Sequence, residues 1–292
     1  MKKRNHYAAD LFLLLQRMAP QHLLSQLAGK LADNTTPWLK NFLIRQFSRI
    51  YKVNLLEAER ESIEDYRSFN DFFTRELKSG ARPQATHENY QTTINSPVDG
   101  EISQYGRIKE GRLIQAKGVD YSLVELLGGD EKAAEPYLNG AFITIYLSPK
   151  DYHRVHMCRS GKLLSMTYVP GDLYSVNQTT TEHLPNLFAR NERVVSFFES
   201  EGKIQHASVM VGAMIVGSIE TVWDGIIAPP NKSISHFLYK KTRSVSLKQG
   251  DEMGRFRLGS TVILLLQEDN LHWDERVRCG ESVKLGQSLA FC

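Results

Sequence analysis

Three features are scarce in this sequence of 292 residues, and each scarcity argues against a class of protein. Its three cysteines, Cys158, Cys279 and Cys292, are scattered and form no CxxC pair, which disfavours a disulfide framework and a cysteine-rich zinc site. The net charge of only +3 is too small to indicate a partner nucleic acid. The longest apolar runs, 11–15 and 262–266, fall far short of the roughly 20 residues that a transmembrane helix needs.

The rest of the composition is that of an ordinary globular chain. Hydrophobic residues make up 41% and charged residues 24%, enough apolar material for a sizeable core. The first 18 residues have a superficial likeness to a signal peptide, but Asp10 and Arg17 interrupt the apolar block and no clean small-residue cleavage site follows. We therefore expect the protein to stay in the cytosol.

Residues 1–50 predict three short amphipathic helices with a basic character. Their only acidic residues are Asp10 and Asp33, and apolar residues recur at helical spacing. Pro20 separates two of these helices, and Thr36 followed by Pro37 fits the start of the third. Two interpretations stay open on these residues alone. The apolar faces pack on the body of the protein, or they lie in a membrane interface with basic residues against anionic headgroups.

The remaining sequence predicts a short connection and then a body made mostly of strands. Residues 66–74 look like a compact docking element, and residues 75–86 read as a linker. β-branched and aromatic runs predict strands at 141–147, 162–169, 193–198, 204–211, 214–222 and 261–267, with helices only at 121–127 and 130–138. We expect an α+β fold: N-terminal amphipathic helices (residues 1–78) followed by a mainly antiparallel β sandwich or barrel-like catalytic body (residues 79–292).

Four segments carry residues suited to chemistry, and each has an ordinary structural interpretation too. Asp99 lies in a Pro- and Gly-bounded turn, where a plain turn aspartate is common. His153 and His156 follow a strand end and share one face if the segment is a helix or a tight loop, but not if it is a regular strand. A zinc pair is disfavoured, because no cluster supplies a third ligand. The polar, arginine-rich segment 170–193 is either a surface loop or an anion-binding wall.

The fourth segment is the Gly259-Ser260-Thr261 turn, which leads into an apolar strand. It is either a routine turn or a place where the Ser260 hydroxyl attacks the Gly259 carbonyl. Asp99, His156 and Ser260 would together supply an orienting acid, a base and a nucleophile. A serine hydrolase would use the same three residues, although Ser260 lacks the G-x-S-x-G pattern. A membrane-binding module without catalytic activity is the third alternative.

Taken in order, several segments resemble the bacterial type of the phosphatidylserine decarboxylase family over nearly the whole chain. They are YRSFNDFFTREL, SPVDGEIS, YLSPKDYHRVHM, PGDLYSVN, PNLFARNERV, VGAMIVGSIETVW and MGRFRLGST. LGST is the self-cleavage motif of that family, and it is intact here. One stretch departs from the pattern: many relatives have Pro and Cys directly after the His-Met pair, where this chain has Cys158-Arg159-Ser160.

The resemblance implies a self-processing enzyme. Asp99, His156 and Ser260 would form the processing triad, and Ser260 would attack the Gly259 carbonyl to give an ester. Elimination and hydrolysis would then release ammonia and leave a covalent pyruvoyl group at position 260, between a long chain ending at Gly259 and a short chain. The implied reaction decarboxylates phosphatidylserine to phosphatidylethanolamine through a Schiff base with this carbonyl, with the pyruvoyl group as electron sink. His153 would be the proton donor and Tyr146 would line the substrate pocket; no metal is implied.

The resemblance also bears on partners and location. A substrate with two acyl chains stays in the bilayer, so the enzyme must come to it, which favours the interfacial interpretation of residues 1–50. We therefore expect a peripheral protein on the cytoplasmic face of an anionic cell membrane. The long and short chains would stay associated, and the resemblance is compatible with a homodimer.

Overall fold

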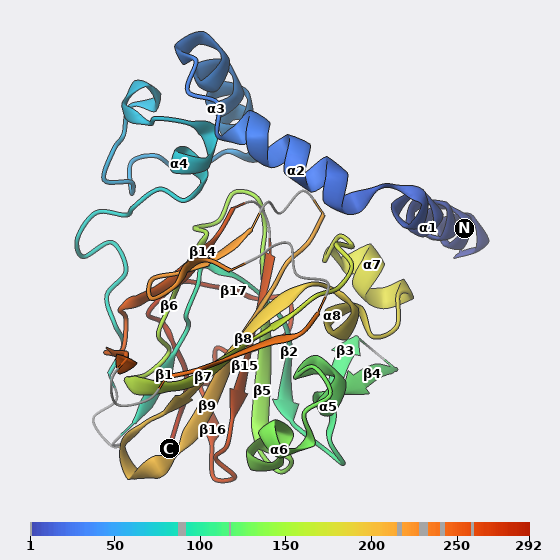
Figure 1. Cartoon of the computed structure of the whole chain (residues 1–292), viewed down its shortest axis with the longest axis vertical. Coiled ribbons are helices and arrows are strands. Elements are labelled where there is room, and N and C mark those ends of the chain that lie inside the picture. Colours follow the sequence, from blue (N-terminus) through green and yellow to red (C-terminus); the bar gives the residue numbers. More distant parts are fainter. Residues whose placement is uncertain are drawn as a thin grey trace.

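The computed structural model describes residues 2–86, 92–116, 118–214, 218–227, 233–239, 243–257 and 260–292. Its N-terminal part is helical and lies along the upper edge of the molecule in Figure 1, above the strands. The helices are α1 (Lys2–Met18), α2 (Gln21–Ala32), α3 (Pro37–Tyr51) and α4 (Phe69–Phe73), with the short 3-10 turn η1 (Ile63–Asp65). The three predicted amphipathic helices are thereby confirmed. Pro37 is the first residue of α3 and Thr36 its N-cap, as the sequence indicated.

A small aromatic core holds α3 and α4 together. The Phe47 ring of α3 lies 5.1 Å from Phe69 and 5.8 Å from Phe73 of α4, both in edge-to-face contact. Phe72 and Tyr66 complete this cluster and are fully buried. The Tyr66–Thr74 segment therefore docks on α3, since aromatic edge-to-face pairs add to the stabilisation from burying their area.

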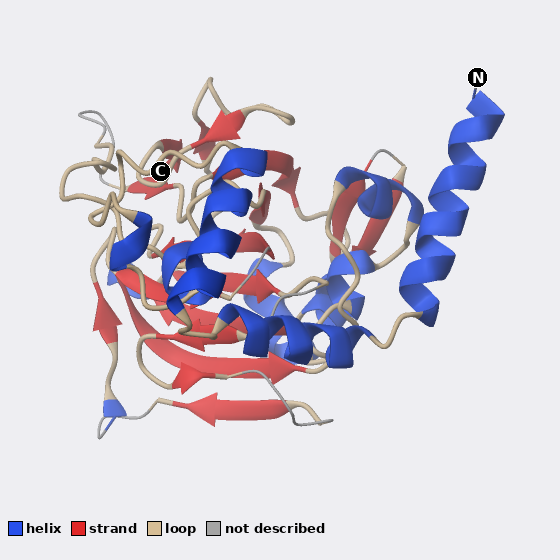
Figure 2. Ribbon diagram, turned by 90° about the horizontal axis from the view of Figure 1, so that it is seen from above, coloured by secondary structure: helices blue, strands red, loops and turns tan. Residues whose placement is uncertain are grey.

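The body is built from antiparallel strands, as predicted (Figures 1 and 2). The largest sheet has nine strands in the order β12-β7-β8-β9-β15-β5-β2-β17, with β13 also paired to β7. A four-stranded sheet runs β11-β10-β14-β6, a three-stranded sheet runs β1-β18-β16, and β3 pairs with β4. Figure 2 shows α1 at the outer edge of the molecule, and its buried Leu13 packs into a core cluster that includes Leu113 of β3 and Tyr121 of β4.

The strands are β1 (Thr93–Asn95), β2 (Gly100–Arg107), β3 (Arg112–Ala116), β4 (Val119–Ser122), β5 (Ala141–Leu147), β6 (Arg154–His156), β7 (Gly161–Val169), β8 (Arg193–Glu199), β9 (Gln205–Val211), β10 (Ile219–Thr221), β11 (Gly225–Ile226), β12 (Ser235–Leu238), β13 (Ser246–Leu247), β14 (Glu252–Phe256), β15 (Ser260–Leu266), β16 (His272–Trp273), β17 (Ser282–Val283) and β18 (Ser288–Phe291). The helices of the body are α5 (Leu123–Leu126), α6 (Glu131–Ala134), α7 (Gln178–His183) and α8 (Leu187–Arg190), with the 3-10 turns η2 (Glu135–Tyr137) and η3 (Glu201–Lys203).

Two predicted elements differ from the structure. The strand expected over 214–222 is a strand only at Ile219–Thr221, while residues 215–217 lie outside the described residues. The helix expected over 121–127 begins at Leu123, because Ser122 ends β4 and its side chain accepts a hydrogen bond from the backbone N–H of Glu125. This N-cap fixes the helix start two residues later than hydrophobic spacing alone indicated.

Strand β15 is the centre of the body. It pairs with β5 on one side and with β9 on the other, and all seven of its residues are buried. Val262, Leu264 and Leu266 pack into one core cluster, and Ile263 and Leu265 pack into the cluster on the opposite face. Because both faces of β15 are covered, the strand reads in the sequence as a continuous apolar run rather than as an alternating one.

Candidate active site

Ser260 is the first residue of β15, at one end of the central strand. It pairs with Leu147 of β5, its side chain is 0% exposed, and its hydroxyl has no hydrogen-bond partner among the described residues. Gly259, the other residue of the expected cleavage site, lies outside the described residues. A buried hydroxyl without a partner is costly, but several other buried hydroxyls of the described residues share this state, so what distinguishes Ser260 is its position directly after Gly259, at the start of the central strand.

Asp99 reaches the same end of the sheet through β2. Glu101 of β2 pairs with Tyr146 of β5, and Tyr146 pairs with Thr261 of β15, so Asp99 and Ser260 lie at the same end of β5, on its two sides. Gly100 permits this approach: a Cβ on it would lie 2.5 Å from the Tyr146 carbonyl oxygen. The glycine of the SPVDG motif is therefore needed for close backbone packing rather than for an unusual turn.

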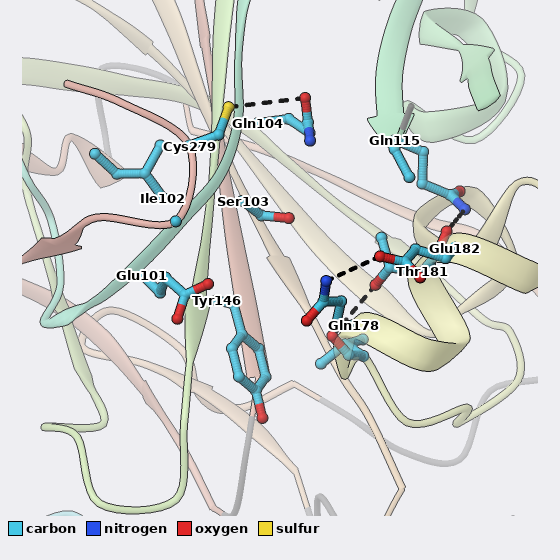
Figure 3. Close-up of a pocket in the computed structure, with 13 residues that line it drawn as sticks. Glu101, Ile102, Ser103, Gln104, Gln115, Tyr146, Gln178, Thr181, Glu182 and Cys279 are labelled. Atoms are coloured by element: carbon cyan, nitrogen blue, oxygen red, sulfur yellow. Dashed lines mark hydrogen bonds between the residues drawn. The ribbon is translucent and has the colours of Figure 1, made fainter. Parts of the chain in front are cut away.

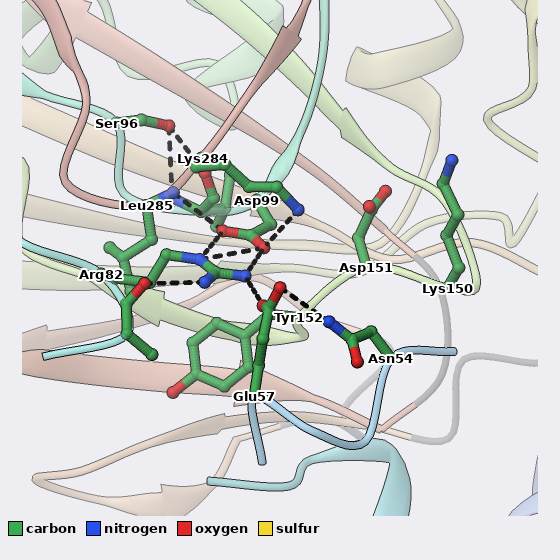
Figure 4. Close-up of polar contacts among 12 residues, drawn as sticks. Asn54, Glu57, Arg82, Ser96, Asp99, Lys150, Asp151, Tyr152, Lys284 and Leu285 are labelled. Carbon is green, nitrogen blue, oxygen red and sulfur yellow. Dashed lines mark hydrogen bonds and ion pairs between the residues drawn. The ribbon is translucent and has the colours of Figure 1, made fainter. Parts of the chain in front are cut away.

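The carboxylate of Asp99 is held by cations and a backbone donor (Figure 4). Arg82 donates to it from Nε at 2.9 Å and from Nη2 at 2.7 Å, Lys284 Nζ lies 3.0 Å away, and the Leu285 N–H donates at 2.9 Å. Burial acts to raise the pKa of Asp99, but the Arg82 hydrogen bonds and the charges on Lys284 and Arg82 hold it below its ordinary value of 3.8. Asp99 is therefore a buried carboxylate that is charged at neutral pH.

His156 lies beside this end of the sheet but has other partners. Its backbone N–H donates to the Pro97 carbonyl at 2.8 Å, two residues before Asp99. Its ring Nδ1 lies 2.8 Å from the Gly250 carbonyl oxygen, and the Tyr152 hydroxyl lies 3.1 Å from its Nε2. Burial lowers the pKa of His156, which favours the neutral ring. The structure thus brings Asp99 and His156 into one region without a direct hydrogen bond between their side chains.

His153 is the more deeply buried of the two histidines, at 0% exposed. Its Nδ1 donates to the Asp151 carbonyl at 2.9 Å, since a carbonyl oxygen only accepts, and its Nε2 is buried with no partner in the described part of the chain. The Phe73 ring lies 4.0 Å from the imidazole. Burial lowers the pKa of His153 to about 3, so the ring is neutral with its lone pair on Nε2.

The two histidines flank the chain that leads to Ser260. β6 holds His156 and pairs with β14, and the carbonyl of His153 accepts a hydrogen bond from the Phe256 N–H at 3.0 Å. Phe256 ends β14, four residues before Ser260. His153 therefore lies outside regular secondary structure, and the strand begins at Arg154. The sequence had left open a tight turn and a regular strand, and the HRVH segment lies between the two.

Tyr146 lies close to Ser260 on the neighbouring strand β5, but its side chain points to the other face of the sheet. Ser260 is level with Leu147, and Tyr146 is level with Thr261, so strand alternation puts the two side chains on opposite faces of the sheet. Tyr146 lines a cavity of about 430 Å³ together with Glu101, Gln104, Gln178 and Thr181 (Figure 3). Burial raises the pKa of its phenol.

The most buried arginine of the segment 170–193 has a structural role. Arg193 is 2% exposed, and its guanidinium donates to the carbonyls of Leu126, Ala189, Asn191 and Glu125. These bonds use four of the five N–H donors of the guanidinium, which leaves too few for a bidentate contact with an anion. Within the described residues, no group of three or more His, Cys, Asp or Glu side chains is arranged to hold a metal ion.

Several residues of the site were not singled out in the sequence. Arg82 lies in the stretch read as a linker, Lys284 lies near the C-terminus, and Tyr152 lies directly before the HRVH motif without standing out. Tyr152, Arg82 and Asp99 all line one cavity of about 190 Å³. Of the three, only Tyr152 could have been found from the sequence, because it lies one residue before His153. Nothing in the sequence links Arg82 or Lys284 to Asp99.

The comparisons with known proteins show the family to which this chain belongs. A family model described as phosphatidylserine decarboxylase matches residues 69–291, and a second model, described as PSD, matches residues 11–52. A protein of Hahella chejuensis named phosphatidylserine decarboxylase proenzyme is 51% identical over 280 residues, which cover 96% of this chain and 93% of the relative. A protein of the same name from Pseudomonas fluorescens is 49% identical over 291 residues, 99% of this chain and 98% of the relative. This chain belongs to the phosphatidylserine decarboxylase family.

Proposed function

We propose that this chain cleaves itself and then converts phosphatidylserine into phosphatidylethanolamine and CO₂. The observation that carries the proposal is Ser260: a buried hydroxyl without a partner among the described residues, at the start of the central strand. A pyruvoyl group made from Ser260 fits this position, because replacing the hydroxyl breaks no hydrogen bond of the described structure. When present, the group supplies a carbonyl that acts as the electron sink for decarboxylation.

In self-cleavage, Ser260 is the nucleophile and His156 the base. Nε2 of His156 takes the hydroxyl proton as Oγ of Ser260 attacks the carbonyl carbon of Gly259, which moves the acyl group from nitrogen to oxygen. Elimination removes the Cα proton of residue 260 and breaks its Cβ–O bond, which frees the Gly259 carboxylate, and water then displaces the nitrogen as ammonia and supplies the carbonyl oxygen. Asp99 keeps a fixed negative charge beside the imidazole that becomes positive.

In decarboxylation, His153 moves the proton. Its neutral Nε2 takes a proton from the substrate ammonium, which must lose one before the amine can react, and returns it to the carbon that loses CO₂. The Phe73 ring against the imidazole keeps water away from this nitrogen. Tyr146 belongs to the proposal as a wall of the larger cavity, on the opposite face of the sheet.

Residues 1–78 form the membrane-association region, and residues 79–292 form the catalytic domain. The large apolar side chains of α1–α3 that are about half exposed or more are Leu11, Leu14, Leu15, Met18, Leu23, Leu27, Leu31, Trp38, Phe42 and Ile50. Exposed Arg17, Lys30, Arg45 and Arg49 accompany them. Among the described residues, no helix is both long and apolar enough to cross a bilayer. We place these helices flat in the cytoplasmic face of an anionic membrane, where the substrate is.

The processed enzyme keeps its two chains together and forms a homodimer. β15 of the short chain is paired on both sides by strands of the long chain, and β17 pairs with β2. The homodimer rests on the family resemblance, and light scattering of the purified, detergent-free body tests it: a mass of a single copy contradicts the dimer.

The proposal is tested with vesicles that contain phosphatidylserine. The purified chain should release CO₂ and form phosphatidylethanolamine, and Ser260→Ala should do neither. Lysophospholipid or free fatty acid in place of these products would indicate a serine hydrolase. Binding to the vesicles without any product would indicate a membrane-binding module. Either result would overturn the proposed reaction.

A further inference from the structure

We propose that Tyr152 is the residue that positions His156 for self-cleavage, a task that falls to the aspartate in a Ser-His-Asp triad. The proposal rests on the self-cleavage proposed above. It concerns only how the base is held, so its test is separate from the test of the reaction.

Two contacts fix the imidazole of His156. Its Nδ1 lies 2.8 Å from the Gly250 carbonyl oxygen, which only accepts, so the ring proton is on Nδ1. The Tyr152 hydroxyl lies 3.1 Å from Nε2 and therefore donates to its lone pair. The ring centroids are 5.6 Å apart. Gly250 sets the tautomer, and Tyr152 fixes the direction of the nitrogen that acts as base.

Asp99 does not make the contact that a triad aspartate makes. Both of its oxygens accept hydrogen bonds from Arg82, and Lys284 and the Leu285 N–H bind the same carboxylate. Nδ1 of His156, the atom that a triad aspartate would bind, is taken by Gly250. Asp99 therefore acts on His156 through its charge, while hydrogen bonding to the ring is left to Tyr152 and Gly250.

Tyr152 is itself held rigidly. It is 5% exposed, and the turn before it is closed by Ser148, whose N–H and hydroxyl bind the Asp151 carboxylate at 2.9 and 2.7 Å. Arg75 donates to the carbonyl of Lys150 at 3.2 Å. Burial raises the pKa of the Tyr152 phenol, so its hydroxyl keeps its proton and stays a donor. The hydroxyl proton can turn to its other in-plane position about the C–O bond, so it can leave Nε2 to Ser260 without movement of either ring.

The first test measures the protonation and hydrogen bonding of the two His156 ring nitrogens by NMR. In the uncleaved Ser260→Ala chain labelled with ¹⁵N-histidine, His156 should show a protonated Nδ1 and a hydrogen-bonded, unprotonated Nε2, assigned by the signal that His156→Gln removes. Adding Tyr152→Phe should move the Nε2 signal to the position of a free acceptor. Asp99→Asn should move it less than Tyr152→Phe does. The opposite tautomer, or a larger shift from Asp99→Asn, would overturn the proposal.

The second test reads the rate of self-cleavage in the chain with Ser260 intact. Tyr152→Phe should slow the appearance of the short chain about fivefold to tenfold, the loss expected for one buried hydrogen bond. Tyr137→Phe is the matched control, because Tyr137 is fully buried and its hydroxyl has no partner among the described residues. Cleavage by Tyr152→Phe at the unsubstituted rate, or faster, would contradict a positioning role. If the unsubstituted chain itself does not cleave, the proposed function fails instead.

Discussion

Arg82 decides, at the scale of single residues, whether Asp99 can stay charged. The Asp99 side chain is 2% exposed and Arg82 12%, and Arg82 also pairs with Glu57. Charges buried this deeply are stable only while their partners remain. Because the pKa of Asp99 is lowered, the stability that it contributes is present above its unfolded pKa and is lost as the pH falls through its folded pKa.

Arg82→Met should therefore destabilise the protein and make it more sensitive to acid. We expect a loss of about 3 kcal/mol in the free energy of unfolding, the lower end for breaking a buried pair, because Lys284 still binds the carboxylate. The raised pKa of Asp99 should move the onset of acid unfolding to higher pH. Circular dichroism of Ser260→Ala chains over a pH series measures both.

Arg112→Met is the control for Arg82→Met. Arg112 and Asp120 also form an ion pair, but their side chains are 48% and 54% exposed, so its loss should leave the free energy of unfolding almost unchanged. Equal effects of the two substitutions would show that the pair with Asp99 is not the source of the instability.

Substitutions of His156 and His153 should impair different steps, self-cleavage for His156 and decarboxylation for His153. His156→Ala should accumulate uncleaved chain, because the base for Ser260 is lost. His153→Ala should still cleave, at least in part, but should make phosphatidylethanolamine about 10²–10⁴-fold more slowly, the usual range for a lost general acid or base. Electrophoresis reads cleavage and product analysis reads turnover. A cleaved His153→Ala enzyme with near-normal turnover would remove His153 from the mechanism.

At the scale of elements, the sequence predicted regular structure better than it predicted contacts. The strand 141–147 matches β5 residue for residue, because its apolar and β-branched run is bounded by Gly140 and the Ser148-Pro149 turn. Asp99, His156 and Ser260 could be singled out because their motifs are local in sequence. The bonds of Arg82 and Lys284 to Asp99 could not, since they join residues 17 and 185 positions apart. Lys284 follows β17, which pairs with β2, and Arg82 lies in irregular chain, so neither contact follows from local propensity.

The exposed apolar face of α1 and α2 is the element that should bind membranes. Replacing Leu15, Met18 and Leu27 together by Ser should weaken binding to anionic vesicles about tenfold or more, because three side chains that would enter the interface become polar. Self-cleavage should be little changed. Vesicle flotation measures the binding. The control Ile114→Ser/Leu138→Ser removes exposed apolar residues from the body, and an equal loss of binding in the control would contradict the assignment.

At the scale of the whole molecule, the short chain that cleavage would produce is paired with the long chain at several places. Beyond the strand pairings, Arg159 and Glu268 form a buried ion pair across the expected chains, with side chains 4% and 6% exposed. Arg159 belongs to the stretch 158–160, which departs from the family pattern, so one partner of this ion pair lies in that stretch. Lys284 binds Asp99 from the same short chain. The fold can therefore be assembled before cleavage and kept after it.

The central claim is that Ser260 becomes the cofactor, and the mass of the purified protein under denaturing conditions tests it most directly. The account predicts two chains, a long one ending at Gly259 and a short one of residues 260–292. The short chain should be lighter, by the equivalent of one ammonia, than the same chain beginning with serine, and Ser260→Ala should give one intact mass. A single intact chain that nevertheless decarboxylates phosphatidylserine, or a short chain that begins with an unmodified serine, would contradict the account.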